Sequence, residues 1–177
     1  MKKYSIRNFT QGIKNLIYWL PVIWKDRNWD GFYIYEILQH KIAAQSKHIA
    51  KGDIHTRAQQ DARRMNVCVS LIKKCQEDFY EMEYMDYCET EFRFEDSEKE
   101  GFSELFIDDI SENLDDYFKK YPLIYKRASK GEGPFSHEER DGDGKRVIAM
   151  NIASINQSRA RKLLFKVMED NLEKWWG

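Results

Sequence analysis

Four polar side chains form a line along one face of a predicted helix in the middle of the chain. They are Arg63, Asn66, Ser70 and Lys74, and their steps of three, four and four residues place them on one helix face. An arginine can hold a phosphate through two hydrogen bonds, a lysine adds a point charge, and the two neutral side chains can bond to polar groups. The line suggests a site for an anionic, nucleotide-like ligand. The alternative interpretation is that it is the solvated side of the helix.

A second candidate site lies in the segment from Trp24 to Asp30. Trp24 and Trp29 flank a cationic turn, so an indole could stack on a base while Arg27 binds a phosphate. A structural interpretation competes with this one, because Asp30 can cap the following helix and Trp29 can pack against Ile34 as a hydrophobic staple. We therefore favour structural roles for Trp29 and Asp30 and keep Trp24 and Arg27 as candidate ligand-binding residues.

The usual catalytic motifs do not occur in the sequence. It contains no G-x-S-x-G, no P-loop and no G-x-G-x-x-G, and its four histidines form no H-E-x-x-H. His40 and His48, eight residues apart on one predicted helix, are interpreted as satisfied or exposed side chains. Cys68 and Cys75 are interpreted as packed thiols rather than metal ligands. We expect a binding protein that is not an enzyme and has no cofactor or metal.

Acidic pairs leave one enzymatic alternative open. Asp86 and Glu89 are three residues apart, as are Glu112 and Asp115. Two such pairs on facing helices can hold Mg²⁺, which prefers carboxylates together with a substrate phosphate. The pattern loosely resembles that of the all-helical nucleoside triphosphate pyrophosphohydrolases. A magnesium-dependent hydrolase of that kind is therefore the alternative to a binding protein.

Charge is unevenly distributed along the chain. Its 29 basic and 30 acidic side chains nearly cancel, yet residues 1–75 carry 14 basic and 5 acidic side chains, and residues 76–117 carry 2 and 17. The acidic block would oppose duplex DNA, so we exclude that partner. It also permits a third function, an interaction module that presents an acidic face to a basic protein.

Other compositional features indicate a cytosolic protein that does not enter a membrane. The longest apolar run, Leu16–Trp24, is nine residues long, against about 20 in a membrane-spanning helix. Three cysteines at unremarkable spacing fit a reducing compartment.

Apolar spacing predicts a mostly α fold: one domain over residues 1–177, with four to five main helices and at most one short β-hairpin. The first helix has an apolar face and should end or kink at Pro21. The second should begin at Asp30 and end near Gly52, with Ile34, Leu38, Ile42 and Ile49 inward. A long central helix is expected over residues 56–86, because an apolar seam recurs there at steps of three and four: Met65, Cys68, Ile72, Cys75, Phe79 and Met82.

The remainder of the chain is less regular. Alternation over residues 89–96 favours a strand, which could pair with residues 104–107, although an irregular connection is equally compatible. A helix is expected from Asp108 to Tyr121, followed by a short one from Leu123 to Ser129. Residues 131–144 hold four glycines and should form a flexible loop before a last helix over residues 146–176.

Two segments resemble a family of small helical proteins carried by tailed bacteriophages. One is the W-x-D-R-x-W-D turn at Trp24–Asp30, and the other is the last helix with its closing pair, Trp175 and Trp176. The family is in turn similar to phage anti-defence sponges, which sequester the cyclic-nucleotide signals of bacterial immunity without cleaving them. This resemblance implies a homo-oligomer that binds such a signal in the host cytoplasm and needs no metal.

Overall fold

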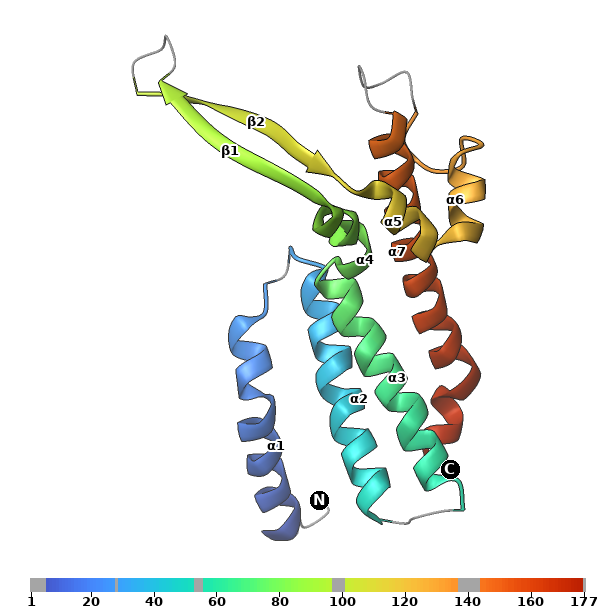
Figure 1. Cartoon of the computed structure of the whole chain (residues 1–177). Helices are drawn as coiled ribbons and strands as arrows, with labels where there is room; N and C mark the ends of the chain where they lie inside the picture. The colour runs from blue at the N-terminus through green and yellow to red at the C-terminus, as the bar shows by residue number, and fades with distance from the viewer. Residues whose placement is uncertain (1–5, 28, 53–55, 97–100, 137–143, 177) are drawn as a thin grey trace. The chain divides into compact units, whose positions relative to one another are not determined.

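The chain folds into helices and one β-hairpin. The computed structural model describes residues 6–27, 29–52, 56–96, 101–136 and 144–176. Over these residues the chain is mostly α-helical and contains one two-stranded antiparallel sheet (Figure 1). The predicted fold class is therefore confirmed. No helix that the structure describes combines the length and apolar character needed to cross a bilayer.

Two compact units make up the chain. The first comprises Met1–Gln76 with Lys166–Gly177, and the second comprises Glu77–Phe165. The prediction that residues 1–177 fold as one domain stays a prediction.

Three long helices form most of the first unit. These are α1 (Ile6–Lys25), α2 (Phe32–Gly52) and α3 (Ala58–Gln76), and α2 lies between the other two (Figure 1). The α2 and α3 helices pack along each other, and the predicted inner residues Ile42 and Ile49 are buried. By contrast, α1 buries a single described residue, Val22.

The predicted boundary between the first two helices is correct in part. The backbone N–H of Phe32 donates to the Asp30 carboxylate at 2.8 Å, so Asp30 caps α2 as expected. The staple is wrong, since Trp29 and Ile34 are 83% and 64% exposed. The expectation that the first helix ends at Pro21 is also wrong. The helix continues to Lys25 with Pro21 inside it.

The long central helix predicted over residues 56–86 is shorter than expected. It ends at Gln76, because Asp78 adopts a left-handed backbone conformation with φ of 45°, which an α-helix cannot contain. Two short elements follow, α4 (Phe79–Met82) and the 3₁₀ turn η1 (Glu83–Tyr87). The first four seam residues are buried, whereas Phe79 and Met82 are 40% and 52% exposed.

The second unit begins with a β-hairpin. In it, β1 (Cys88–Asp96) pairs antiparallel with β2 (Ser103–Glu112), from Cys88 opposite Glu112 to Asp96 opposite Ser103. The predicted pairing is confirmed, but residues 108–112, expected to begin a helix, extend the second strand instead. In the strand their backbone groups pair with β1. As the first turn of a helix, the same residues would leave backbone N–H groups without partners.

The rest of the second unit is helical. The helices are α5 (Leu114–Lys120), α6 (Pro122–Ala128) and most of α7 (Gly144–Asn171). The end of α7, from Lys166, and the 3₁₀ turn η3 (Leu172–Trp176) that continues it belong to the first unit. The short helix after Pro122 and the long last helix are therefore confirmed. The predicted loop is non-helical from Gly131 to residue 136, and residues 137–143 lie outside the described part of the chain.

A buried aromatic cluster forms the core of the second unit. Tyr117 and Phe118 of α5 pack with Ile124 of α6 and Ile152 of α7. The Tyr117 hydroxyl is buried and finds no hydrogen-bond partner among the described residues. Burial raises the pKa of Tyr117, because the phenolate form would lose its hydration.

A buried carboxylate lies beside this core. Glu83, whose side chain is 5% exposed, accepts from the Lys120 ammonium at 2.7 Å and from the Tyr121 hydroxyl at 2.5 Å. The bond to Glu83 raises the pKa of Lys120. Burial, followed by the same carboxylate, raises the pKa of Tyr121. The three side chains thus join η1 to the α5–α6 corner.

Candidate functional site

A cavity of about 560 Å³ lies in the first unit. Ligand sites in proteins commonly measure about 300–1,000 Å³, so this cavity has room for a drug-sized molecule. Tyr18 and Val22 of α1 line one side, Val69 of α3 contributes a second, and α2 supplies the rest: Glu36, Gln39, His40, Ala43, Ala44 and Lys47.

The α2 wall presents opposite charges at its two ends. Glu36, His40, Ala43 and Lys47 follow one another at steps of four, three and four, which places them on one face of the helix. At about 1.5 Å of rise per residue, Glu36 and Lys47 are separated by about 16 Å along the axis. Ala43 and Ala44, with their small side chains, leave the middle of the wall open.

Aromatic rings gather where α1 meets this wall. The Tyr18 ring lies 4.1 Å from the His40 ring between centroids, at an interplanar angle of 35°, and the Trp19 ring lies 4.9 Å from it. The Tyr18 hydroxyl donates to the backbone oxygen of His40 at 3.1 Å. Burial raises the pKa of Tyr18, so at neutral pH this hydroxyl keeps its proton and remains a donor.

His40 carries an unsatisfied polar atom. Its Nε2 is buried and finds no hydrogen-bond partner among the described residues. A buried polar atom left in this state costs about 1–3 kcal/mol. The interpretation of His40 as satisfied or exposed is therefore wrong for Nε2, which is neither hydrogen-bonded within the described part of the chain nor exposed.

The residues predicted in the Trp24–Asp30 turn do not line this cavity. Trp24 is 79% exposed at the end of α1. The Arg27 guanidinium donates to two backbone carbonyl oxygens, that of Asp26 at 2.8 Å and that of Lys25 at 3.3 Å. These bonds hold Arg27 against its own turn. That Trp24 and Arg27 bind a ligand stays a prediction.

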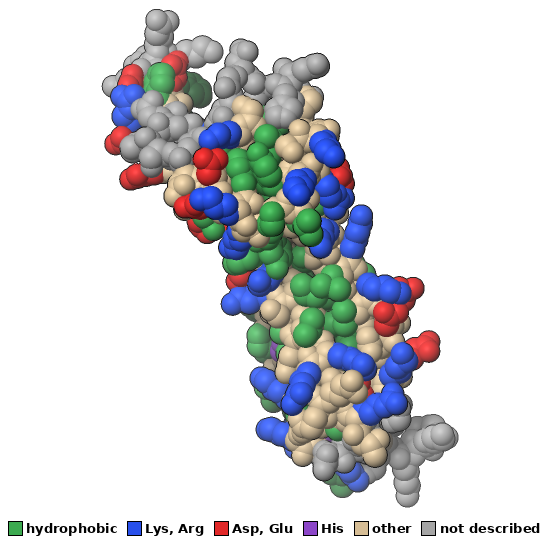
Figure 2. Space-filling model, turned by 45° about the vertical axis from the view of Figure 1, so that its right-hand side comes forward, with side chains coloured by type: hydrophobic (Ala, Val, Ile, Leu, Met, Phe, Trp, Pro, Cys, Tyr) green, Lys and Arg blue, Asp and Glu red, His purple; other side chains and the backbone are tan. Residues whose placement is uncertain are grey.

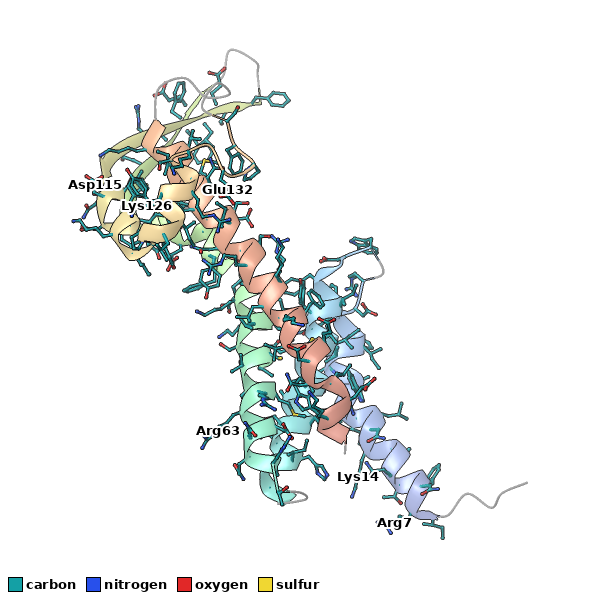
Figure 3. The ribbon with its side chains drawn as sticks, turned by 90° about the vertical axis from the view of Figure 1, so that its right-hand side faces the viewer. Arg7, Lys14, Arg63, Asp115, Lys126 and Glu132 are labelled. Carbon is teal, nitrogen blue, oxygen red and sulfur yellow. The ribbon has the colours of Figure 1, made fainter. Side chains whose placement is uncertain are left out.

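The predicted polar line on α3 also lies outside the cavity. Arg63 is exposed and points outward from the helix (Figure 3), Ser70 is exposed, and Lys74 is half-buried. The Asn66 amide oxygen lies 2.8 Å from the Ser46 hydroxyl of α2, which gives Asn66 a role in helix packing. Neither of the two predicted groups contributes a side chain to the cavity, whose only described lining residue from α3 is Val69.

The acidic pairs do not lie on facing helices. Glu89 belongs to β1 and Glu112 to β2, while Asp86 lies in η1. Asp115, on α5, pairs with Lys145 at 3.1 Å. Within the described part of the chain, no group of three or more His, Cys, Asp or Glu side chains is arranged to hold a metal ion. The helical arrangement on which the hydrolase alternative depended is therefore wrong.

Sequence reasoning missed Glu36, His40 and Lys47 as site residues. A detectable signal was present, since these side chains and Ala43 share one face of the second helix at steps of four, three and four. What the sequence could not supply is the partner of that face. Tyr18 and Val22 come from another helix, and only the packing of α1 closes the cavity.

Basic side chains predominate on one face of the first unit. Lys and Arg side chains are spread over the face of the first unit seen in the lower part of Figure 2, and acidic side chains there are confined to its margin. This agrees with the basic excess of residues 1–75. Such a field favours the approach of an anion.

Comparisons with known proteins give no relative for this chain. No family model matches it, and neither a curated protein nor a solved structure matches it. Membership of the phage family therefore stays a hypothesis that depends on the two Trp-containing segments.

Proposed function

We propose that this protein binds and retains a nucleotide-type ligand in the cavity lined by α1, α2 and α3, without catalysing a reaction on it. One observation carries the proposal. The same cavity combines a lysine, an aromatic wall and a buried imidazole nitrogen that has no partner among the described residues. These groups suit a molecule with a planar ring and an anionic group.

Each part of such a ligand has a counterpart in the cavity. The phosphate would lie near Lys47, whose exposed ammonium provides a charge-assisted hydrogen bond. The base would lie against the Tyr18 and His40 rings. At the far end, Glu36 and the Gln39 carbonyl oxygen can accept hydrogen bonds from exocyclic amino groups.

A sequestering role follows from the resemblance to phage anti-defence sponges. In that role the ligand is a cyclic-nucleotide signal of the host, and the protein acts by retaining it in the host cytoplasm. Retention requires slow release, which an aromatic and partly buried site favours.

Calorimetric titration of the full chain tests the proposal. The probes are AMP, cyclic AMP, cyclic di-AMP and their guanine counterparts. Lys47→Glu should weaken binding at least about tenfold, because it replaces a charge-assisted hydrogen bond by repulsion. Lys51→Glu makes the same charge change one turn further along α2, outside the cavity lining, and should change affinity less than about threefold.

A filling variant provides an independent test of the cavity. Ala43→Trp should abolish binding while circular dichroism shows an unchanged helix content. Binding by none of the probes, or equal effects of Lys47→Glu and Lys51→Glu, would overturn the proposal. Arg63→Glu separates the two candidate sites, since loss of binding in this variant alone would move the ligand to the polar line on α3.

The exposed hairpin favours a second candidate function, docking of a basic protein partner. Phe92 and Phe94 are 56% and 73% exposed on β1, where Glu91 and Glu95 are also exposed. The two rings and the two carboxylates lie on opposite faces of the strand, and Arg93 pairs with Glu95 at 3.2 Å. An exposed aromatic face on an acidic hairpin suits a basic partner. Binding to such a partner would weaken steeply with added salt and would not respond to Lys47→Glu.

A further inference from the structure

The most apolar face of α1 points away from the rest of the first unit. Six large apolar side chains recur along it at steps of three and four, and their exposed fractions range from 43% to 86%. We call these six the α1 seam: Ile6, Phe9, Ile13, Leu16, Leu20 and Ile23. Ile17 and Trp24, which are 67% and 79% exposed, widen the same face.

The opposite face of α1 is the one that packs. Val22 is buried and the Tyr18 hydroxyl bonds to α2, and both residues lie across the helix from the seam. A water-exposed helix normally turns its apolar stripe inward. This helix turns it outward, so the fold of one copy leaves a contiguous apolar surface uncovered by the described residues, and such surfaces mark interaction sites.

The spacing and the charges of α1 fit another helix as the cover. Steps of three and four over nearly three heptads define the contact positions of paired helices. The residues that flank the seam carry no charge: Thr10, Ile17 and Trp24 on one side, Gly12 and Trp19 on the other. The cations of α1 lie on the far side of the helix, where Arg7 and Lys14, one heptad apart, share an edge (Figure 3).

We propose that the α1 seam is covered by the α1 seam of a second copy of this chain, so that the protein is a homodimer. Eight large side chains, at about 100 Å² of apolar surface each, give about 800 Å² per copy, the amount that a stable protein interface buries. Identical seams are self-complementary, as a two-fold symmetric interface requires. No charge of α1 would be brought against its own counterpart.

The pairing would also fix one wall of the cavity. Tyr18 and Val22 line it from α1, and a second copy would clamp α1 from the other side. The dimer inference does not depend on the proposed ligand. A monomer that binds nucleotide would overturn only the dimer, and a dimer without ligand would overturn only the proposed function.

Sedimentation equilibrium of the full chain, from about 1 to 100 μM, tests this inference. The chain has a mass of 21.3 kDa, and we expect twice that mass at the higher concentrations. Leu16→Glu places two buried carboxylates in the middle of the interface and should raise the dissociation constant at least about 100-fold. Gln11→Glu adds the same charge on the opposite face of α1 and should leave the dimer intact.

Two further measurements cover the other outcomes. The urea midpoint of the unaltered chain should rise with protein concentration, which keeps the inference testable even if Leu16→Glu fails to fold. A wild-type monomer at 100 μM, or equal dissociation by the two variants, would overturn it. Monomeric protein that pellets with phosphatidylglycerol vesicles, and loses this behaviour in Leu16→Glu, would assign the seam to an anionic lipid surface instead.

Discussion

The buried carboxylate of Glu83 gives a quantitative prediction for the second unit. Glu83→Gln keeps the shape of the side chain but replaces a charged acceptor by a neutral one. The hydrogen bond from the Tyr121 hydroxyl then contributes about 1 kcal/mol less to the stability of the protein, which is the difference between hydrogen bonds to charged and to neutral acceptors. The Lys120 side chain is 47% exposed, so water replaces much of the lost pair, which contributes about 1 kcal/mol more. We expect a destabilisation of about 2 kcal/mol.

Urea denaturation measures this change, and a neighbouring glutamate provides the control. Glu81 is half-exposed and pairs with Arg161 at 3.9 Å, so Glu81→Gln should lower the free energy of unfolding by less than about 0.5 kcal/mol. The free energy of unfolding should fall with urea concentration at the same slope in both variants, because the same surface is exposed when each unfolds. If Glu83→Gln costs no more than Glu81→Gln, the inference that burial makes this carboxylate important is wrong.

Three further variants test the packing of the second unit. Tyr117→Phe removes a buried hydroxyl that has no partner among the described residues and should stabilise the protein by up to about 1 kcal/mol. Because the pKa of Tyr117 is higher in the folded than in the unfolded protein, the folded state holds the phenolic proton more tightly. The stability that this proton provides is therefore complete below pH 10.0, the ordinary pKa of tyrosine, and is lost as the pH rises above it. The variant should lose less stability than the wild type between pH 8 and 11, and an equal loss in urea denaturation would contradict the assignment. Gly133→Ala should cost at least about 2 kcal/mol, because Gly133 has φ of 141° and a Cβ atom would lie 2.1 Å from Oδ1 of Asn151. Gly131→Ala, with φ of 87° and nothing near its Cβ, should cost about 1 kcal/mol in the same urea denaturation series, and equal costs for the two glycine variants would contradict this account.

Periodic patterns in the sequence predicted α3 and the β-hairpin. The seam from Met65 to Cys75 is buried as the spacing requires, and the hairpin was visible in its alternation. The break at Asp78 was not, because aspartate gives only a weak preference for the left-handed conformation that ends α3. Pro21 also gave a wrong prediction for the end of the first helix. It removes one helical hydrogen bond, but on an exposed helix water can replace that bond.

The candidate site could be predicted only in part. The sequence shows that Lys47 and His40 carry groups able to bind a ligand, and helical spacing places them on one face of the second helix. Which face of α1 would pack is not written there, since its most apolar face is the one left exposed. Hydrophobicity alone would have turned the α1 seam inward and Tyr18 outward, and the cavity would not have formed. Tertiary packing therefore decided the site.

Imidazole NMR of the full chain, with ¹⁵N-labelled histidine, tests the proposed ligand site most directly. His40 lines the cavity, whereas His48 is exposed on the same helix and outside the lining. We expect the His40 signals, assigned by comparison with His40→Gln, to move and saturate on addition of a cyclic nucleotide that binds, while those of His48 stay in place. Binding that leaves the His40 signals unmoved, or that shifts both histidines equally, would contradict the proposal.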